Sequence, residues 1–288
     1  MIQEQKPQAT ANRVNDLLLT ARLDVSESLR AKWFLLYSLV FGGIIASLFI
    51  FGLADSRIMG FTGLSRVLVT YIQLSMAILP IFVLITTVRS LAGDREAGIF
   101  EYMLSLPVSL FAWYWGRFVG RFAVVFLPVF AAMVLGSLYG ILKGAQMPWQ
   151  EFALYTAMLI SLAICFLGIG FLISSLTRAT DIAQGAAFFV WLILLLFLDL
   201  ILLGMMIQEQ APAALVVMVA LLNPLQAFRA GAMMIFDPQL IMLGPSADII
   251  LENFGYNGYL AWALLYPALL GLALGALGYT IFRRGDLP

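Results

Sequence analysis

The chain has 288 residues, of which 62% are hydrophobic and 11% are charged, and its mean hydropathy is +0.99. A water-soluble domain carries about 25% charged residues, so this composition excludes an ordinary soluble globular protein. The formal net charge is zero, and nothing in it indicates a nucleic-acid partner. Without histidine and with one cysteine, Cys165, the chain cannot form a Ser–His catalytic pair or an internal disulfide.

Residues 1–32 are expected to form a cytoplasmic N-terminus that ends in an interfacial helix. The first thirteen residues are polar and lack the apolar core of a signal peptide. Between 13 and 32, apolar side chains recur at helical spacing among charged ones: Val14, Leu17, Leu18, Ala21, Val25 and Leu29. This pattern predicts a helix on the inner membrane surface, in contact with lipid, that leads into a span at Trp33. The alternative is an ordinary solvated helix.

Six apolar runs are long enough to cross a hydrocarbon core of about 30 Å. They lie at roughly 33–53, 68–90, 117–142, 152–176, 184–207 and 259–282. Pro80 and Pro128 fall inside the second and third runs, where neighbouring helices make kinks more favourable than breaks. The predicted fold is an all-α polytopic membrane protein with a six-span domain over 33–282 and a cytoplasmic tail at 283–288.

The distribution of Lys and Arg predicts that both termini face the cytoplasm. Twelve of these residues then lie inside: Lys6, Arg13, Arg22, Arg30, Lys32, Arg89, Arg95, Arg117, Arg121, Arg178, Arg283 and Arg284. Four lie outside: Arg57, Arg66, Lys143 and Arg229. This asymmetry fits a multi-pass protein of a cytoplasmic membrane.

Glycines recur at four-residue spacing in three places: Gly116 and Gly120; Gly136, Gly140 and Gly144; Gly271 and Gly275. Such spacing lets helix backbones approach closely within a bilayer. Packing within the chain is the commoner meaning, and a subunit interface is the alternative.

The stretch 208–258 is expected to lie on the outer side of the membrane. Its apolar part, AALVVMVALL (213–222), is too short to cross, so we expect a re-entrant or surface-lying piece that caps the bundle. Asn223 and Pro224 follow it as a turn signal. This outer segment offers the most room for a partner on that side.

Several chemistries lack their residues. There is no GxxxxGK[ST] motif, which indicates that the chain does not itself hydrolyse nucleotide. Asp199, in WLILLLFLDLILLG (191–204), is the one carboxylate that we place at membrane depth. Such a group is costly unless it is paired, protonated or hydrated, so it marks either a functional site or a structural hydrogen bond. A proton-coupled transporter usually needs more than one such group.

The methionine pairs could either bind Cu(I) or simply pack in apolar helices. The pairs Met205–Met206 and Met233–Met234 fall on the outer half of the chain, and thioethers suit Cu(I). Methionine is also a common filler of apolar helices, and the chain is expected to hold no metal or cofactor of its own.

A charged segment at 93–116 separates the second and third spans. Asp94, Glu96 and Glu101 lie close to Arg89 and Arg95, and an apolar stretch continues to Pro107. This composition predicts a short helix along the membrane surface whose charged end docks on a soluble subunit. The alternative is an ordinary cytoplasmic loop.

Residues 93–120 resemble the coupling segment of ABC-2 type transporter permeases. The matching positions are Asp94, Glu96, Ala97, Gly98, Glu101, Leu104, Pro107, Ser109, Gly116, Arg117 and Gly120. Leu110 departs from the pattern, because a basic residue is usual there. The resemblance implies the architecture of a type V exporter. It also implies that Asp94, Arg95, Glu96, Gly98, Glu101 and Pro107 couple the chain to a cytoplasmic ABC ATPase, which binds ATP and Mg²⁺.

A closer similarity links the chain to a branch of this family that serves the maturation of nitrous oxide reductase. It rests on residues 21–36, on Trp191 with Asp199, and on LLNPLQAFR (221–229). This similarity implies a homodimer in a bacterial inner membrane, two ATPase subunits, and a periplasmic protein that contacts the outer segment near Asn223, Pro224 and Arg229. The complex would alter a partner that handles copper.

Three functions therefore stand at this point. The first is the membrane subunit of a copper-site assembly complex, and the second is an ABC-2 exporter of a lipid, drug or polysaccharide. The third is a proton-coupled secondary transporter that uses Asp199. An intramembrane enzyme lacks the necessary residues.

Overall fold

The computed structural model describes residues 9–30, 32–52, 63–98, 109–197, 221–236 and 245–285, together with residues 200, 204 and 218. Every regular element in this part of the chain is a helix. In chain order these are α1 (Ala9–Arg30), α2 (Lys32–Gly52), α3 (Gly63–Glu96), α5 (Leu110–Leu142), α6 (Trp149–Leu176), α7 (Thr180–Leu192), the π-helix η1 (Ile193–Phe197), α10 (Pro224–Phe236) and α11 (Pro245–Gly285).

Four described helices are long and apolar enough to cross a membrane, over Thr70–Glu96, Leu110–Leu142, Trp149–Leu176 and Phe254–Arg284. They coincide with the second, third, fourth and sixth predicted spans. Helix α2 and the α7–η1 helix occupy the places expected for the first and fifth spans. The chain is thus an all-helical, multi-pass membrane protein, and the count of six spans remains a prediction.

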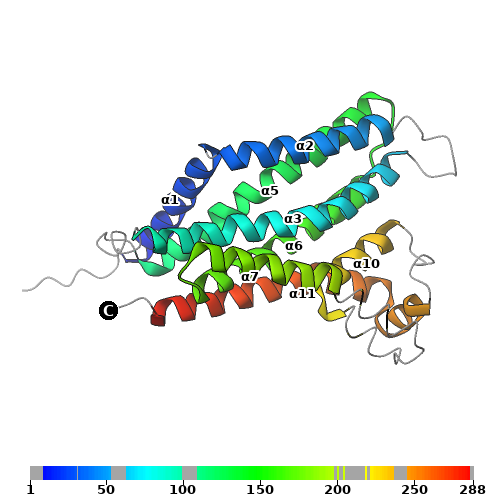
Figure 1. Cartoon of the computed structure of the whole chain (residues 1–288). Helices are drawn as coiled ribbons and strands as arrows, with labels where there is room; N and C mark the ends of the chain where they lie inside the picture. Colours follow the sequence, from blue (N-terminus) through cyan, green and yellow to red (C-terminus); the bar gives the residue numbers. More distant parts are fainter. Residues whose placement is uncertain are drawn as a thin grey trace, which may run out of the picture.

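The long helices run side by side, as Figure 1 shows, with α1 crossing them at one end and α10 lying at the other. Helix α6 packs on α3, α5, α7, α10 and α11, so it forms the centre of the bundle. Its sequence is apolar on nearly all sides, which is typical of a helix enclosed by neighbours. Helices α1 and α2 pack mainly on α5.

Two glycine pairs let helices approach at backbone distance. A side chain on Gly168 of α6 would overlap the carbonyl group of Gly271 in α11. On α5, a Cβ on Gly116 would lie 2.7 Å from Thr20, and one on Gly120 would lie 2.7 Å from the Ala21 carbonyl oxygen. The spacing of Gly116 and Gly120 therefore serves packing within the chain, where it seats α1 against α5.

Tyrosine hydroxyl groups in the core donate to backbone carbonyls of other helices. Tyr71 of α3 donates to Val129 at 2.6 Å, and Tyr114 of α5 donates to Gly275 at 3.0 Å. The indole nitrogen of Trp191 in α7 donates to Ala77 of α3 at 3.3 Å. In an apolar bundle these bonds offset the cost of burying a polar group, and they fix the rotation of each helix about its axis relative to its neighbour.

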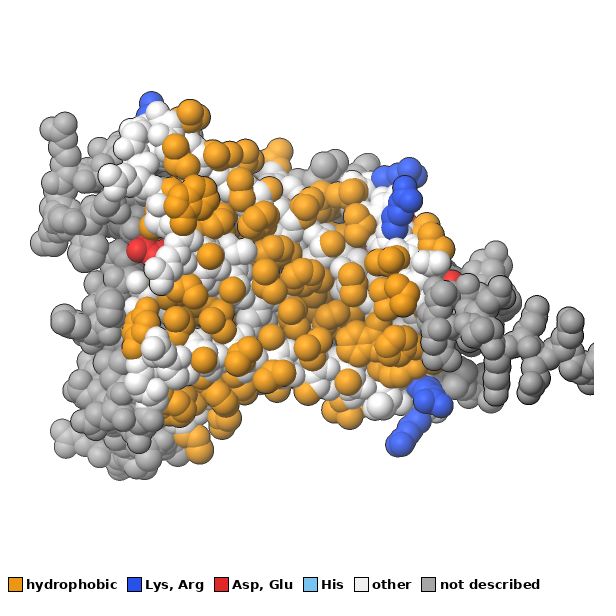
Figure 2. Space-filling view, turned by 180° about the vertical axis from the view of Figure 1, so that it is seen from behind, with side chains coloured by type: hydrophobic (Ala, Val, Ile, Leu, Met, Phe, Trp, Pro, Cys, Tyr) orange, Lys and Arg blue, Asp and Glu red, His pale blue; other side chains and the backbone are white. Residues whose placement is uncertain are grey.

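The surface of the bundle suits a lipid environment. Figure 2 shows Lys and Arg side chains near the two ends of one face, with apolar side chains covering the region between them. Large apolar residues are exposed on several helices, among them Leu39, Leu127, Leu135, Leu265 and Leu269. Such a continuous apolar belt is unfavourable in water and favourable in hydrocarbon.

The structure differs from the sequence expectations in two segments. Residues 224–236, which follow the expected turn at Asn223 and Pro224 and had no predicted element, form α10, because Asn223 caps the helix and Pro224 occupies its first position. Helix α11 begins at Pro245, well before the predicted span, and has a non-helical residue at Gly255 (φ 64°, ψ 171°). The positive φ explains why a glycine stands at that break.

Candidate functional site: a charged junction at the coupling end

The end of α3 lies where several helices of the bundle begin or end. We call this the coupling end: it holds Glu96 of α3, Leu110 of α5, Leu176 of α6, Thr180 of α7 and Gly285 of α11 (Figure 1). Residues 99–108, which include the predicted coupling residues Glu101 and Pro107, lie outside the described part of the chain. The residues on both sides of this stretch are described.

Gly98 and Ser109 define how the chain leaves α3 and enters α5. Gly98 has a φ of 68°, and its amide donates to the Arg95 carbonyl, so it ends α3 in the left-handed conformation that glycine favours. Ser109 caps α5, because its hydroxyl accepts a hydrogen bond from the Ala112 amide at 3.2 Å. Both positions of the family pattern therefore have a local structural reason.

A network of charged and polar side chains joins α3, α5 and α1. Arg117 of α5 forms an ion pair with Asp94 of α3 and contacts Ser90. Arg121, one turn further along α5, donates to the Ser90 hydroxyl at 2.9 Å and to Asp24 of α1 at 2.7 Å. We call these five residues the inner charge network. It explains why an acidic residue on α3 and an arginine on α5 occur together in the pattern.

The Asp24 carboxyl is the most buried member of this network, with 3% of its surface exposed. Burial raises the pKa of Asp24 above its usual value, and the neighbouring Arg121 and Arg117 oppose that rise. One of its oxygens, Oδ2, has no hydrogen-bond partner among the described residues. A buried carboxylate of this kind depends strongly on the cation beside it.

Arg95 reaches the end of α6. Its Nη1 donates to the carbonyl oxygens of Ser174, Ser175 and Thr177 at 3.2, 3.2 and 3.0 Å. The last carbonyls of a helix have no partner within the helix, and a cation there is also favoured by the helix dipole. The guanidinium lies 4.7 Å from the ring centre of Phe282 in α11, in a cation–π contact.

Glu96 binds the start of α7. Its Oε2 accepts a hydrogen bond from the Thr180 amide at 3.0 Å, which places an anion at the N-terminus of that helix. Arg95 and Glu96 are consecutive, so two neighbouring side chains of α3 hold the two sides of the turn between α6 and α7. We call this pair of contacts the α6–α7 clamp.

These contacts make the last turn of α3 a mechanical junction. Asp94 reaches α5, Arg95 reaches α6 and α11, and Glu96 reaches α7. The last turn of α3 therefore contacts four other helices.

The remaining predicted residues are an intramembrane carboxylate and two methionine pairs. Asp199 and the pair Met205–Met206 fall outside the described residues. Met234 is fully buried and packs with Ala230 and Tyr259, with Met233 against the same cluster. Among the described residues, no group of three or more His, Cys, Asp or Glu side chains is placed to hold a metal ion.

Asn223, Pro224 and Arg229 belong to the α10 end of the bundle. The Asn223 side chain is 2% exposed; its oxygen accepts from the Leu225 amide at 3.0 Å and its nitrogen donates to Leu194 of η1 at 2.8 Å. Pro224 is buried and Arg229 is exposed. Asn223 and Pro224 therefore position α10, and contact between Arg229 and a partner stays a prediction.

Sequence reasoning gave no role to Asp24, Ser90, Arg121 or Thr180, although each takes part in the junction. A signal for Asp24 was present in α1, where Ala21, Asp24 and Ser28 share one face and are all buried. The exposed positions of the same helix are mixed: Val14, Leu18, Leu19, Leu23 and Leu29 are apolar, and Asn15, Arg22, Ser26, Glu27 and Arg30 are polar or charged. A helix with both kinds of exposed side chain fits a position at the border between lipid and water.

The helical bundle and its apolar belt define a multi-pass membrane protein, and sequence comparison gives its family. The pattern of the family described as "ABC-2 family transporter protein" matches residues 18–287. The chain therefore belongs to the ABC-2 family of transporter proteins, whose members are membrane permease subunits and are generally not catalytic.

Within that family the chain is similar to two proteins named "Probable ABC transporter permease protein NosY". The protein from Stutzerimonas stutzeri is 26% identical over 283 residues, which cover 94% of this chain and 99% of that one. The protein from Pseudomonas aeruginosa is 25% identical over 273 residues, covering 92% and 96%. The resemblance to the ABC-2 permeases that the sequence indicated is thus confirmed, including the similarity to NosY.

Proposed function

We propose that this chain couples ATP hydrolysis by a separate cytoplasmic subunit to an event on the periplasmic side of a bacterial inner membrane. The ATPase subunit is NosF-like and holds ATP and Mg²⁺, while the present chain holds neither. The event is assembly of the copper sites of nitrous oxide reductase, in which copper is the cargo of a periplasmic, NosD-like partner. Two copies of the chain form the membrane unit.

The observation that carries the coupling role is the junction at the end of α3. Asp94, Arg95 and Glu96 at the end of α3 bind other helices through charged contacts. A force applied to the chain after Gly98 would therefore act directly on those helices. An ordinary loop would not need three consecutive charged residues engaged with four helices. The similarity to NosY over nearly the whole chain supports the choice of cargo.

An ABC-2 exporter of a lipid, drug or polysaccharide is the second candidate, because the same family and the same junction serve it equally well. A proton-coupled transporter that works through Asp199 requires no ATPase. The partners of the chain therefore separate the three functions.

The first test is purification of the tagged chain in a mild detergent, with identification of what accompanies it. A P-loop ATPase together with a periplasmic protein is the expected result. An ATPase alone would favour the exporter, and stimulation of its activity by a lipid or drug would decide for that function. A folded chain that brings neither partner in several detergents would overturn the proposal and direct attention to Asp199.

The second test addresses coupling and uses Glu96→Gln, with Asp181→Asn as its control. Both carboxylates are exposed and lie at the start of α7, but only Glu96 binds the Thr180 amide. Glu96→Gln should leave the assembled complex intact and reduce transport-linked function per ATP hydrolysed. Equal behaviour of the two variants would contradict the role given to the α6–α7 clamp.

A further inference from the structure

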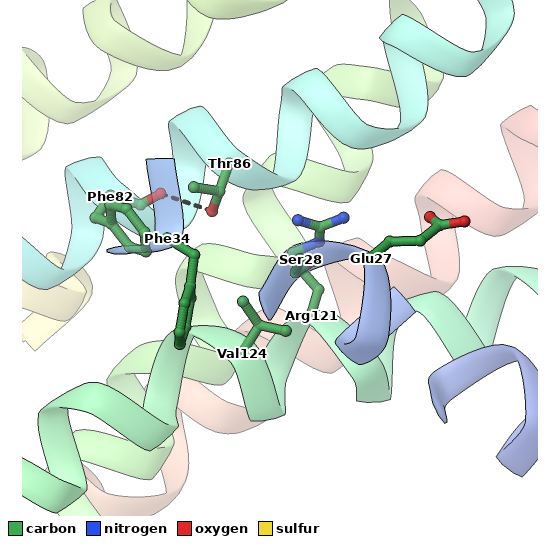
Figure 3. Close-up of a pocket in the computed structure, with 7 residues that line it drawn as sticks. All are labelled: Glu27, Ser28, Phe34, Phe82, Thr86, Arg121 and Val124. Atoms are coloured by element: carbon green, nitrogen blue, oxygen red, sulfur yellow. Dashed lines mark hydrogen bonds between the residues drawn. The ribbon is translucent and has the colours of Figure 1, made fainter. Parts of the chain in front are cut away.

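A half-open cavity of about 230 Å³ lies beside the inner charge network, between α1, α2, α3 and α5. Its lining consists of Glu27, Ser28, Phe34, Phe82, Thr86, Arg121 and Val124 (Figure 3). Pockets for drug-sized ligands measure about 300–1,000 Å³. The cavity is therefore large enough for a polar headgroup and a few attached carbons, but too small to enclose a whole lipid.

The polar part of the lining holds one cation and one anion. Both hydrogen bonds that position Arg121 use its Nη2 atom, so among the described residues its Nη1 is the nitrogen left to bind a molecule in the cavity, while its Nε is buried. A guanidinium carries five N–H donors, so Arg121 keeps donors for a further acceptor. The Glu27 carboxylate is exposed, and the next residue, Ser28, adds a hydroxyl group to the lining.

The remaining lining is apolar except for Thr86, whose hydroxyl donates to the Phe82 carbonyl at 2.8 Å. Phe34, Phe82 and Val124 form one side of the cavity, and the aromatic ring of Phe82 stacks on Tyr37. Leu29 and Leu36, which flank Ser28 and Phe34 along the chain, are 42% and 52% exposed. An apolar occupant of the cavity therefore has an apolar surface beside it.

The order of these groups is the decisive feature. Figure 3 shows Phe34 and Phe82 on one side, the Arg121 guanidinium in the middle, and Glu27 on the other side, with its carboxylate directed outward, away from the two rings and from Arg121. A molecule that lies across the cavity thus meets apolar carbon, then a cation, then an anion. A phospholipid with an ammonium headgroup presents the complementary sequence: acyl chain, phosphate, ammonium.

We propose that this cavity binds the headgroup of a zwitterionic phospholipid, with its phosphate on Arg121, its ammonium on Glu27 and its first acyl carbons against Phe34 and Phe82. An anionic lipid would satisfy Arg121 but would bring its charge close to Glu27. The bound lipid joins α1 to α3 and α5 at the coupling end. This inference does not depend on the cargo or on the ATPase partner.

The test is a lipid titration of the purified, delipidated chain, followed by native mass spectrometry. The probes are palmitoyl-oleoyl phosphatidylethanolamine, palmitoyl-oleoyl phosphatidylglycerol and the soluble headgroup glycerophosphoethanolamine. We expect one phosphatidylethanolamine to bind about fivefold more tightly than phosphatidylglycerol, the ratio that about 1 kcal/mol for an exposed ion pair gives. The soluble headgroup should bind at least about tenfold more weakly, because it has no acyl carbons to bury.

Two variants with matched controls identify the site. Val124→Phe fills the cavity and should remove the tight lipid, whereas Val119→Phe adds the same bulk at a position on α5 that is 44% exposed and should not. Glu27→Gln should bring the ratio of the two lipid affinities close to one, and Asp181→Asn should leave it unchanged. Because Glu27 is exposed, Glu27→Gln should fold, and it tests the proposed lipid site even if Val124→Phe does not fold.

Each contrary result has a definite meaning. Equal binding by the Val124→Phe and Val119→Phe proteins would show that the lipid is only part of the surrounding bilayer, and would overturn the proposal. An unchanged lipid ratio in Glu27→Gln would also overturn it. Equal affinity for the soluble headgroup and the lipid would assign the cavity to a free phosphate compound instead.

Discussion

The coupling end and the α10 end of the bundle are held together by different interactions. At the coupling end, charged side chains of one helix bind charged groups or helix termini of another, as in Asp94–Arg117, Asp24–Arg121 and Arg95 on α6. At the α10 end, neutral side chains donate to backbone carbonyls: Asn223 to Leu194, and Trp262 to Leu221. The first kind of contact is stronger but depends on both partners.

The difference suits the two tasks that we assign to these ends. Charge-assisted contacts are stronger and geometrically more specific than neutral ones, so under the proposed function they would pass motion of α3 to the helices that it contacts. Neutral hydrogen bonds to carbonyls cost less to break and reform, since each contributes only about 1 kcal/mol. The α10 end can therefore rearrange when the other end moves. Variants that break one kind of contact or the other test this distinction.

The largest effect is expected from Arg117→Met. Removal of one partner from a buried ion pair costs about 3–5 kcal/mol, because the Asp94 carboxylate is left without its cation. We expect the melting temperature in detergent to fall by roughly 10 °C, since about 1 kcal/mol shifts a protein of this size by 2–4 °C.

The control for Arg117→Met is Arg178→Met, which removes an exposed arginine and should change stability by less than about 0.5 kcal/mol. The double variant Asp94→Asn/Arg117→Met removes both charges and should regain at least half of the loss. A double variant as unstable as the single one would show that the ion pair is not the cause.

The next effect depends on pH and concerns Arg121→Gln. Burial already raises the pKa of Asp24, and loss of Arg121 removes the main opposing influence, so the pKa rises further. An acid with a raised pKa in the folded state costs stability above that pKa, and the cost disappears as the pH falls through it. The loss of melting temperature should therefore be smaller at pH 5.5 than at pH 8.

The charged groups that act on Asp24 include Arg117 and Glu27, and both remain in Arg121→Gln. Arg178→Gln serves as the control and should show no such pH dependence. An equal loss at both pH values would mean that Asp24 is not responsible. At the α10 end, Asn223→Ala should likewise be insensitive to pH, because its contacts carry no titrating group.

Asn223→Ala is expected to destabilise the chain by about 1–2 kcal/mol, less than Arg117→Met. The change removes the cap of α10, which alone is worth about 1 kcal/mol, and the bond to Leu194 of η1. Asn223→Asp keeps the capping oxygen but loses the donor, so it should lie between the wild type and Asn223→Ala in a thermal unfolding measurement. Equal loss in both variants would mean that the cap contributes nothing.

Hydropathy was sufficient to place the long helices, because length and apolar composition decide what can cross a membrane. The α10 helix was missed although its signal was present: Asn223 is a favourable capping residue and Pro224 a favourable first position. The pattern around Gly98 predicted a coupling segment at 93–116. It could not reveal the inner charge network, because Asp24, Ser90 and Arg121 are distant in sequence and meet only through the packing of α1 on α5.

Functional interpretation was weakest where a residue type has two uses. Gly116 and Gly120 fitted either a dimer interface or packing within the chain, and only the three-dimensional contact with α1 distinguishes them. Asp94, Arg95 and Glu96 were expected to dock on an ATPase. The structure shows that these side chains also bind neighbouring helices, which no one-dimensional pattern expresses.

The sharpest comparison of the two ends comes from Gly98→Ala and Gly144→Ala, whose effect on stability should be about as small as that of Asn223→Ala. Both glycines are exposed, have φ values of 68° and 85°, and have nothing within 4 Å of an added Cβ. Each substitution should therefore cost about 1–2 kcal/mol through the left-handed backbone alone. A thermal unfolding measurement should show nearly equal shifts.

Of these two glycines, only Gly98 lies in the coupling segment, just after the α6–α7 clamp. Only Gly98→Ala should therefore reduce function per ATP hydrolysed in the assembled complex. Gly98→Asn should retain more function than Gly98→Ala, because asparagine adopts the left-handed conformation more easily. Equal losses of function from Gly98→Ala and Gly144→Ala would mean that stability alone is affected. The direction in which the chain leaves α3 would then not matter for coupling, and the contrast between the two ends would lose its functional meaning.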